Sequence, residues 1–93
     1  MASMYDVLKD YLLTVKEDSI TLTYSEINTL IKKRNPYKKL PQTAYKNTAW
    51  WDNNSDRHTQ MYSWVNAGFL VDMRKSNLGD FIYFRKTLQD VKL

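Results

Sequence analysis

Two alternating segments near the C-terminus, joined by a turn, limit the folds that this chain can adopt. Apolar and polar residues alternate over 69–74 and again over 81–86, which is typical of β-strands. The residues Ser76 to Asp80 between these segments favour a turn. Gly68, just before the first segment, stands where the left-handed C-terminal cap of a helix is expected. The sequence therefore predicts a helix followed by a C-terminal two-stranded β-hairpin.

Three to four helices are predicted before the hairpin. Apolar residues at steps of three and four indicate the first helix. A capping box, in which Thr23 and Glu26 bind each other's backbone N–H groups, indicates the start of the second. The expected helices cover about residues 5–16, 24–33, 42–51 and 57–67, with a short extended segment at 20–22.

This order of elements predicts an α+β fold. The whole chain, 1–93, is expected to form a single domain, with an ordered core over about 4–86 and a tail over 87–93. A helical core followed by a helix, a glycine and a hairpin resembles a winged helix-turn-helix. In that layout the helix at 57–67 is the recognition helix and the hairpin is the wing. The additional helix at 42–51 departs from the pattern.

Length and composition exclude several classes of protein. The 93 residues contain no Cys, which excludes a disulfide-stapled scaffold and a thiolate metal site, and a single His cannot build a zinc site. No apolar stretch approaches the ~18 residues of a membrane span, and the N-terminus lacks the pattern of a signal peptide. We therefore expect a cytoplasmic protein with no membrane association, no metal and no cofactor.

The positive charge is concentrated in the middle of the chain. The net charge is +4, and residues 27–51 contain no Asp or Glu. The basic side chains of this stretch are Lys32, Lys33, Arg34, Lys38, Lys39 and Lys46. A long stretch of one sign creates a positive field that favours polyanions, although a solvated loop would give the same composition. These six residues are the first candidates for phosphate contacts.

Further candidate contacts follow from the winged-helix pattern. The start of the predicted recognition helix carries Arg57, His58 and Gln60, and such helices read bases with their N-terminal residues. Arg74 and Lys75, near the hairpin tip, can bind phosphate. Residues with a possible stacking or turn contact are Trp50, Asn53 and Asn54. The structural alternatives are a core Trp and turn-forming Asn residues.

A catalytic site is not predicted. His58 lies near Asp52 and Asp56 in the sequence, but a general base also needs a nucleophile within reach. No Ser or Cys stands in a nucleophile motif, and the spacing of these acidic residues matches no metal-binding loop. We therefore expect a non-enzymatic protein.

One set of residues resembles a family signature. The set is Leu40-Pro41, Ala49-Trp50-Trp51, Asn53, His58, Gln60, Trp64, Ala67-Gly68 and Val71. Over residues 5–86 the chain resembles an uncharacterised domain family of bacteria and their phages, with the signature LP…AWWxN…HxQ…WxxAGxxV. Members of that family occur alone or in the company of nucleases, so the resemblance implies an association with nucleic acid. The Lys-rich loop before Leu40 is longer than in that pattern, which suggests a local specialisation.

Two functions are compatible with these features. The first is a DNA-binding module with a basic face. The second is a phage or mobile-element protein that inhibits a host defence or replication protein, using exposed aromatic residues such as Tyr37, Tyr45 and Tyr62. The sequence leaves open whether the protein is a monomer or a homodimer.

Overall fold

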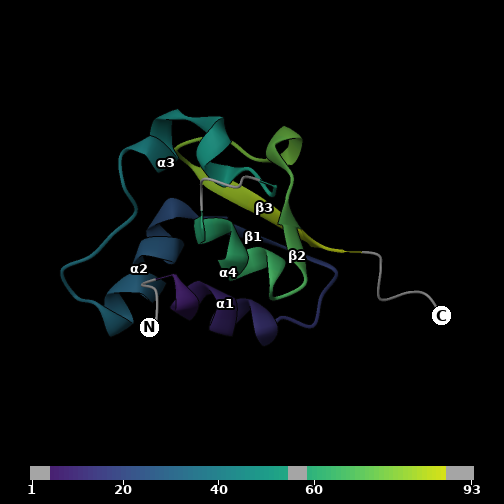
Figure 1. The fold of residues 1–93 in the computed structure, drawn as a ribbon, viewed down its shortest axis with the longest axis horizontal. Coiled ribbons are helices and arrows are strands. Elements are labelled where there is room, and N and C mark those ends of the chain that lie inside the picture. Colours follow the sequence, from purple (N-terminus) through teal and green to yellow (C-terminus); the bar gives the residue numbers. More distant parts are fainter. Residues whose placement is uncertain (1–4, 55–58, 88–93) are drawn as a thin grey trace.

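The fold is a small α+β domain in which helices cover one face of an antiparallel sheet (Figure 1). The computed structural model describes residues 5–54 and 59–87. In chain order, the helices and strands are α1 Asp6–Leu13, β1 Ser19–Thr23, α2 Tyr24–Arg34, α3 Thr43–Lys46, α4 Tyr62–Val65, β2 Phe69–Val71 and β3 Phe81–Lys86. Three short 3-10 helices are η1 Thr48–Trp51, η2 Thr59–Met61 and η3 Met73–Lys75. Within the described residues, no helix is long and apolar enough to cross a membrane.

The sheet has three strands in the order β1-β3-β2, one strand more than the predicted two-stranded hairpin. The hairpin itself is present, with Val71 opposite Phe84. The additional strand, β1, pairs with the free side of β3 and places Leu22 opposite Ile82. The extended segment at 20–22 was predicted, but its partner lies some sixty residues away and leaves no local signal. This pairing continues the apolar face of the hairpin across a further strand.

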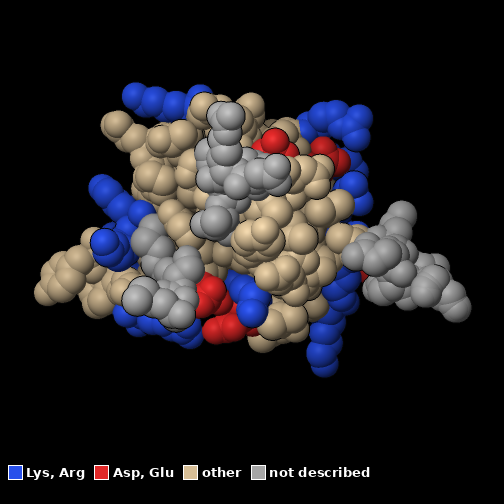
Figure 2. Space-filling view, in the orientation of Figure 1, with Lys and Arg blue, Asp and Glu red and all other residues tan. Residues whose placement is uncertain are grey.

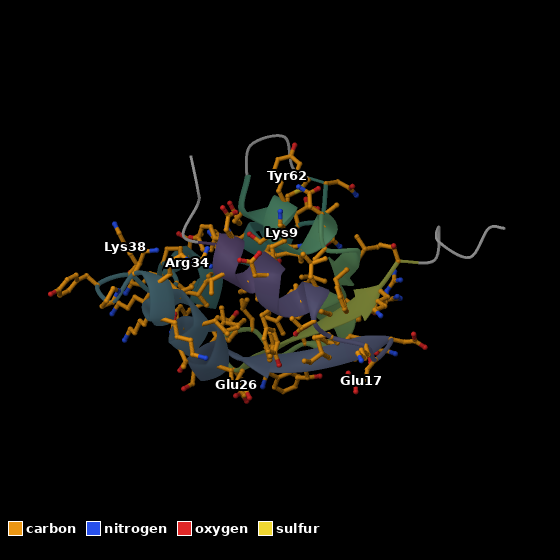
Figure 3. All side chains as sticks on the ribbon, turned by 90° about the horizontal axis from the view of Figure 1, so that it is seen from below. Lys9, Glu17, Glu26, Arg34, Lys38 and Tyr62 are labelled. Atoms are coloured by element: carbon orange, nitrogen blue, oxygen red, sulfur yellow. The ribbon has the colours of Figure 1, made fainter. Side chains whose placement is uncertain are left out.

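The alternation of β3 is confirmed by burial. Ile82 and Phe84 are fully buried, whereas Tyr83 and Arg85 point to the other face of the sheet. Leu12, Ile27 and the other apolar residues of α1 and α2 close the core from the helical side. The core therefore lies between the sheet and the helices, and the opposite face of the sheet is left without a helical cover (Figure 3).

Two local predictions at helix ends are confirmed. The Thr23 side chain accepts from the Glu26 N–H at 3.0 Å, and the Glu26 carboxylate accepts from the Thr23 N–H at 2.8 Å. Gly68 has a φ of +87°, a conformation that favours glycine. Both features are decided by residues within a few positions of one another, which is why the sequence reveals them.

Three predicted helices are shorter than expected. The helix expected at about 5–16 covers only Asp6–Leu13. The helix at 42–51 is divided into α3 and η1 at Asn47, which has an extended backbone and whose side chain accepts from the Ala49 N–H. An Asn side chain competes with helical hydrogen bonding in this way. The helix at 57–67 can be compared only from Thr59 onward, where a 3-10 turn leads into α4. The strand at 69–74 ends at Val71, because the Asp72 side chain accepts from the Arg74 N–H and caps η3.

Candidate nucleic-acid interface

The C-terminal end of α2 and the loop after it carry a cluster of cations. We call this cluster the basic end; its members are Lys32, Lys33, Arg34, Lys38 and Lys39. All five side chains are exposed. Arg34 and Lys38 lie at the same end of the molecule in Figure 3. Cations in the last turn of a helix interact favourably with its partial negative charge, so these residues stabilise the end of α2 and also concentrate charge there.

The loop that carries the basic end is fixed on both sides. On one side the Asn35 N–H donates to the Ile31 carbonyl at 2.9 Å, and the Lys38 N–H donates to the Asn35 carbonyl at 2.9 Å. On the other side the Leu40 N–H donates to Oδ1 of Asn28 on α2 at 2.8 Å, and the Leu40 side chain is buried. The loop therefore returns to the helix that it leaves, and its cations stay together.

Tyr37 stands within this cluster and is 98% exposed. Among the residues that the structure describes, the other exposed large hydrophobic side chains are much less exposed, Leu13 at 60% and Tyr62 at 51%. A phenol ring with both faces free, flanked by lysines, matches the combination that binds single-stranded nucleic acid by base stacking and phosphate contacts. From the sequence, Tyr37 was expected only as a contact for a protein; its position between basic residues is the signal for this second role.

Arg34 is the one member of the basic end with an ion pair among the described residues. Its Nη2 lies 3.2 Å from Oδ2 of Asp10 on α1, and both side chains are about half exposed. This ion pair holds the Arg34 side chain against α1 and partly neutralises its positive charge. The four lysines form no ion pair within residues 5–54 and 59–87 and are available to a polyanion.

The other predicted cations lie elsewhere. Lys46 belongs to α3, whereas Arg74 and Lys75 belong to η3, at the turn between β2 and β3. In Figure 1 that turn and the loop after α2 lie at different ends of the domain. Figure 2 shows Lys and Arg in separate groups, mostly around the edge of the face in view. The predicted basic residues thus do not share one face.

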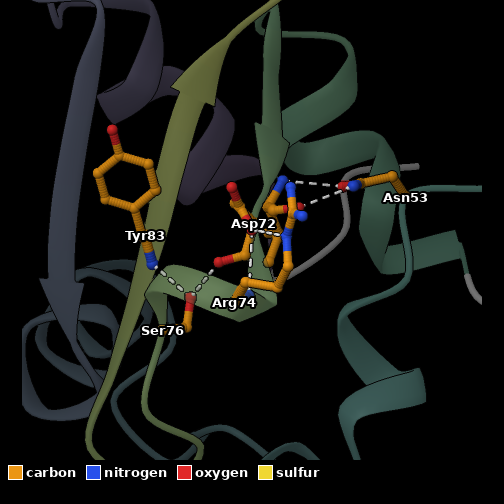
Figure 4. Close-up of polar contacts among 6 residues, drawn as sticks. Asn53, Asp72, Arg74, Ser76 and Tyr83 are labelled. Carbon is orange, nitrogen blue, oxygen red and sulfur yellow. Dashed lines mark hydrogen bonds and ion pairs between the residues drawn. The ribbon is translucent and has the colours of Figure 1, made fainter.

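Arg74 and Lys75 each have a partner on the domain itself. Arg74 Nε lies 3.7 Å from Oδ1 of Asp72, although the Arg74 side chain is 93% exposed (Figure 4). Lys75 Nζ lies 5.2 Å from the centre of the Tyr83 ring, a cation–π geometry. These contacts make the hairpin a weaker candidate for phosphate binding than the basic end.

Trp50 and Gln60 are placed in the interior. The Trp50 side chain is 7% exposed and packs edge-to-face against Tyr5 and Trp51. The Gln60 side chain is 9% exposed, and its Nε2 donates to the Trp50 carbonyl at 2.9 Å. The structure therefore places both predicted base contacts in the core, where neither side chain presents an exposed surface to a base.

Asn53 is also structural. Its Nδ2 donates to the Val71 carbonyl at 2.9 Å, and its Oδ1 accepts from the Val71 N–H at 2.9 Å (Figure 4). The same Oδ1 accepts from Trp64 Nε1 at 2.8 Å. All three amide hydrogen bonds are thus made within the domain. Asn54 is exposed in the adjacent turn, where its N–H donates to Oδ1 of Asp52 at 3.0 Å. Arg57 and His58 lie outside the described residues.

The titration shifts in the structure belong to the core. Burial raises the pKa of Tyr24 and of Tyr5 above the ordinary value of 10.0. The Tyr24 hydroxyl donates to the Ala44 carbonyl at 2.6 Å. The parts of the chain that the structure describes hold no group of three His, Cys, Asp or Glu side chains arranged for a metal ion. The basic end is therefore the cluster of charged side chains that most favours a ligand.

Most of the residues that carry the sequence signature are now accounted for by the fold. Leu40, Trp50, Trp51 and Trp64 are core residues, Asn53 and Gln60 bind backbone groups, and Gly68 adopts a positive φ. The chain belongs to the family described as a domain of unknown function, DUF7662. The match covers residues 5–87, nearly the whole domain, and confirms the resemblance to an uncharacterised family. No curated protein and no solved structure matches the chain.

Proposed function

We propose that this DUF7662 domain is a non-enzymatic DNA-binding module that acts in the cytoplasm and binds phosphate groups with its basic end. The observation that carries the proposal is the concentration of five cations in the eight residues from Lys32 to Lys39, around a tyrosine that is 98% exposed. Phosphate contacts dominate nucleic-acid affinity and need little geometric precision, so exposed lysine side chains suit them.

The mode of contact follows from the position of these residues on α2. The C-terminus of a helix carries a partial negative charge, so its backbone repels a phosphate. The contacts are therefore expected from the side chains, which extend beyond the helix end, and from Tyr37 in the loop. Lysines make phosphate contacts without reading bases. We expect affinity that depends strongly on salt and little on sequence, with stacking on Tyr37 favouring single strands.

A winged-helix arrangement is a further part of the proposal. It is supported by the order α1-β1-α2-α4-β2-β3, in which β1 pairs with β3 and a hairpin follows the last helix. The segment α3–η1 between α2 and α4 is additional to that layout. The contact at the basic end does not depend on the wing, since the β2–β3 turn lies at a different end of the domain (Figure 1).

The proposal is tested by fluorescence anisotropy with random-sequence duplex and single-stranded DNA at about 50 and about 200 mM salt. The variant carries Lys32→Ala, Lys33→Ala, Lys38→Ala and Lys39→Ala. The control removes the same charge from exposed positions elsewhere, with Lys16→Ala, Arg74→Ala, Lys75→Ala and Arg85→Ala. We expect the basic-end variant to lose at least about tenfold in affinity at low salt and to show a shallower salt dependence, and the control to lose much less.

Tyr37→Ala separates stacking from charge. We expect it to weaken binding to single strands by about tenfold and binding to duplex by much less, since one base stack contributes ~1–3 kcal/mol. Equal losses in the two charge variants would mean that net charge, not the basic end, determines binding. An absence of binding by the unmodified protein at low salt would refute the proposal.

A further inference from the structure

The two edges of the sheet differ. At one edge, the N–H and C=O of Val71 on β2 point away from β3 and both bind the Asn53 side chain at 2.9 Å. This amide occupies the place of a neighbouring strand and blocks the addition of another chain there. Native proteins commonly cover exposed strand edges in this way, because unpaired backbone groups recruit other strands.

The other edge, formed by β1, is not blocked. The Lys86 N–H donates to the Asp18 carbonyl at 2.8 Å, and the Tyr24 N–H donates to the Asp80 carbonyl at 3.0 Å. Since inward and outward pairs alternate in an antiparallel ladder, Ile20 and Leu22 bind β3. The backbone groups of Ser19, Thr21 and Thr23 therefore point outward.

Thr23 differs from the other two residues, because its N–H donates to the Glu26 carboxylate in the capping box. The N–H and C=O groups of Ser19 and Thr21 make no hydrogen bond with any part of the chain that the structure describes. These four groups have the spacing that a further antiparallel strand needs for two pairs of hydrogen bonds.

A cavity lies beside this edge on the helical side of the sheet. Its volume is about 240 Å³, and it is lined by Tyr11 of α1, Leu22 of β1, and Ser25, Glu26, Thr29 and Leu30 of α2. Leu22 belongs both to the edge strand and to the cavity wall. In a strand paired with β1, the residue opposite Leu22 would direct its side chain to the same side of the sheet, and thus to the cavity.

The charges around the edge select among possible occupants. Glu26 lines the cavity, and Glu17 and Asp18 come directly before β1. Figure 3 shows Glu26 and Glu17 on the side along which β1 runs, away from Arg34 and Lys38. At the cavity the Glu26 carboxylate repels the phosphates of nucleic acid, whereas Lys16 and Arg85 lie near the Ser19 end of the strand. A second copy paired through β1 would bring the acidic residues before one strand near Glu26 of the other, and like charges at such distances are unfavourable.

We propose that the edge of β1 binds an extended peptide of a partner protein by strand addition. The peptide donates to and accepts from the backbone groups of Ser19 and Thr21. It places an apolar side chain in the cavity opposite Leu22 and directs Lys or Arg side chains toward Glu17 and Glu26. Main-chain hydrogen bonds provide affinity in this binding mode, and pockets for alternate side chains provide specificity. This site is separate from the basic end and does not depend on DNA binding.

The test is an NMR titration of the ¹⁵N-labelled protein with nonapeptides of the form Lys-Lys-Thr-Val-Leu-Val-Thr-Lys-Lys, with Val, Leu or Phe at the centre, and with counterparts that carry Glu in place of Lys. We expect at least one Lys peptide to shift the amide signals of Ser19 and Thr21, and the Glu peptides to bind at least tenfold more weakly. No shift at these amides up to millimolar concentration, or shifts confined to another surface, would overturn the proposal.

Three variants give the controls. Thr21→Pro removes the outward N–H without removing a bond to β3, and should weaken peptide binding at least tenfold; Thr21→Val keeps the N–H and should retain binding. Glu26→Gln keeps an oxygen for the capping box but removes its charge, and should reduce the preference for Lys peptides. DNA binding should be unchanged in Thr21→Pro. If the free protein is a dimer that Thr21→Pro makes monomeric, a second copy occupies the edge and the proposal is wrong.

Discussion

Asn53 forms with Val71 the two hydrogen bonds that a neighbouring β-strand would form. Its Nδ2 donates to the Val71 carbonyl and its Oδ1 accepts from the Val71 N–H, each at 2.9 Å, while the same oxygen accepts from Trp64 Nε1 at 2.8 Å. One side chain in a turn thus closes the sheet edge and fixes the indole of a core residue. The signature residue Asn53 therefore has a structural explanation that needs no ligand.

Asn53→Ala is expected to be strongly destabilising. It leaves both backbone groups of Val71 and the indole N–H of Trp64 without a partner, and the side chains of these two residues are buried. Since each buried polar group left unpaired costs ~1–3 kcal/mol, we expect a loss of about 3 kcal/mol in the free energy of unfolding, measured by urea denaturation. Asn54→Ala, at the exposed neighbouring position, should change it by less than about 0.5 kcal/mol. Similar effects of the two substitutions would contradict this role of Asn53.

The features that the sequence predicts well are those determined by neighbours in the chain. The capping box at Thr23, the positive φ of Gly68 and the alternation of β3 each depend on a few consecutive residues. The pairing of β1 with β3 depends on residues that are distant in the sequence, and only the packed core determines it. The local pattern at 42–51 indicated one helix, but the side chain of Asn47 interrupts it.

The same difference between features determined by neighbouring residues and features determined by distant residues holds for the candidate site. The basic end was predictable, because it is a continuous stretch without acidic residues. The roles of Gln60 and Asn53 were not, since an amide at the start of a helix or in a turn has the same sequence pattern whether it faces solvent or the core. The open edge of β1 could not be predicted either, because the sequence does not reveal the order of the strands and therefore does not show which strand lies at the edge.

The capping box gives a prediction with a built-in control. Thr23→Ala removes the acceptor of the Glu26 N–H and should lower the free energy of unfolding by about 1 kcal/mol. Glu26→Gln retains an acceptor for the Thr23 N–H and should cost less than about 0.5 kcal/mol. Both values come from urea denaturation followed by Trp fluorescence. A larger loss in Glu26→Gln would show that the charge of Glu26 stabilises the first turn more than its hydrogen bond does.

The raised pKa of Tyr24 predicts that the stability of the fold decreases at alkaline pH. Burial raises the pKa of Tyr24 above its ordinary value of 10.0, so the folded state holds the phenol proton more strongly than the unfolded state does. The corresponding stabilisation is present below pH 10 and is lost as the pH rises above it. Tyr24→Phe also removes the hydrogen bond to the Ala44 carbonyl and should cost about 1 kcal/mol at neutral pH.

The measurement is urea denaturation of the unmodified protein and of Tyr24→Phe at a series of pH values from neutral upward. The difference between the two proteins should shrink above pH 10, because only the unmodified protein has this phenol to ionise. Tyr37→Phe removes a hydroxyl from a side chain that is 98% exposed, and should leave the unfolding curves unchanged. A difference for Tyr24→Phe that stays constant with pH would contradict the raised pKa.

Asp10 is expected to weaken DNA binding at the basic end. Its Oδ2 lies 3.2 Å from Nη2 of Arg34, so Asp10→Asn frees this guanidinium and removes a negative charge beside the proposed phosphate site. We expect a two- to fivefold gain in affinity at about 50 mM salt that becomes smaller at about 200 mM, because salt screens exposed charges. The cost in stability should stay below about 1 kcal/mol, as for other exposed ion pairs.

Glu17→Gln is the matched control for Asp10→Asn. It makes the same change in net charge on the side of the domain away from Arg34 and Lys38 (Figure 3). Since DNA bound at the basic end lies far from Glu17, this substitution should raise affinity much less than Asp10→Asn does. Both variants are measured by anisotropy with the same duplex. An equal gain in the two would show that DNA responds to the total charge of the domain, and the contact would then have to be sought away from the end of α2.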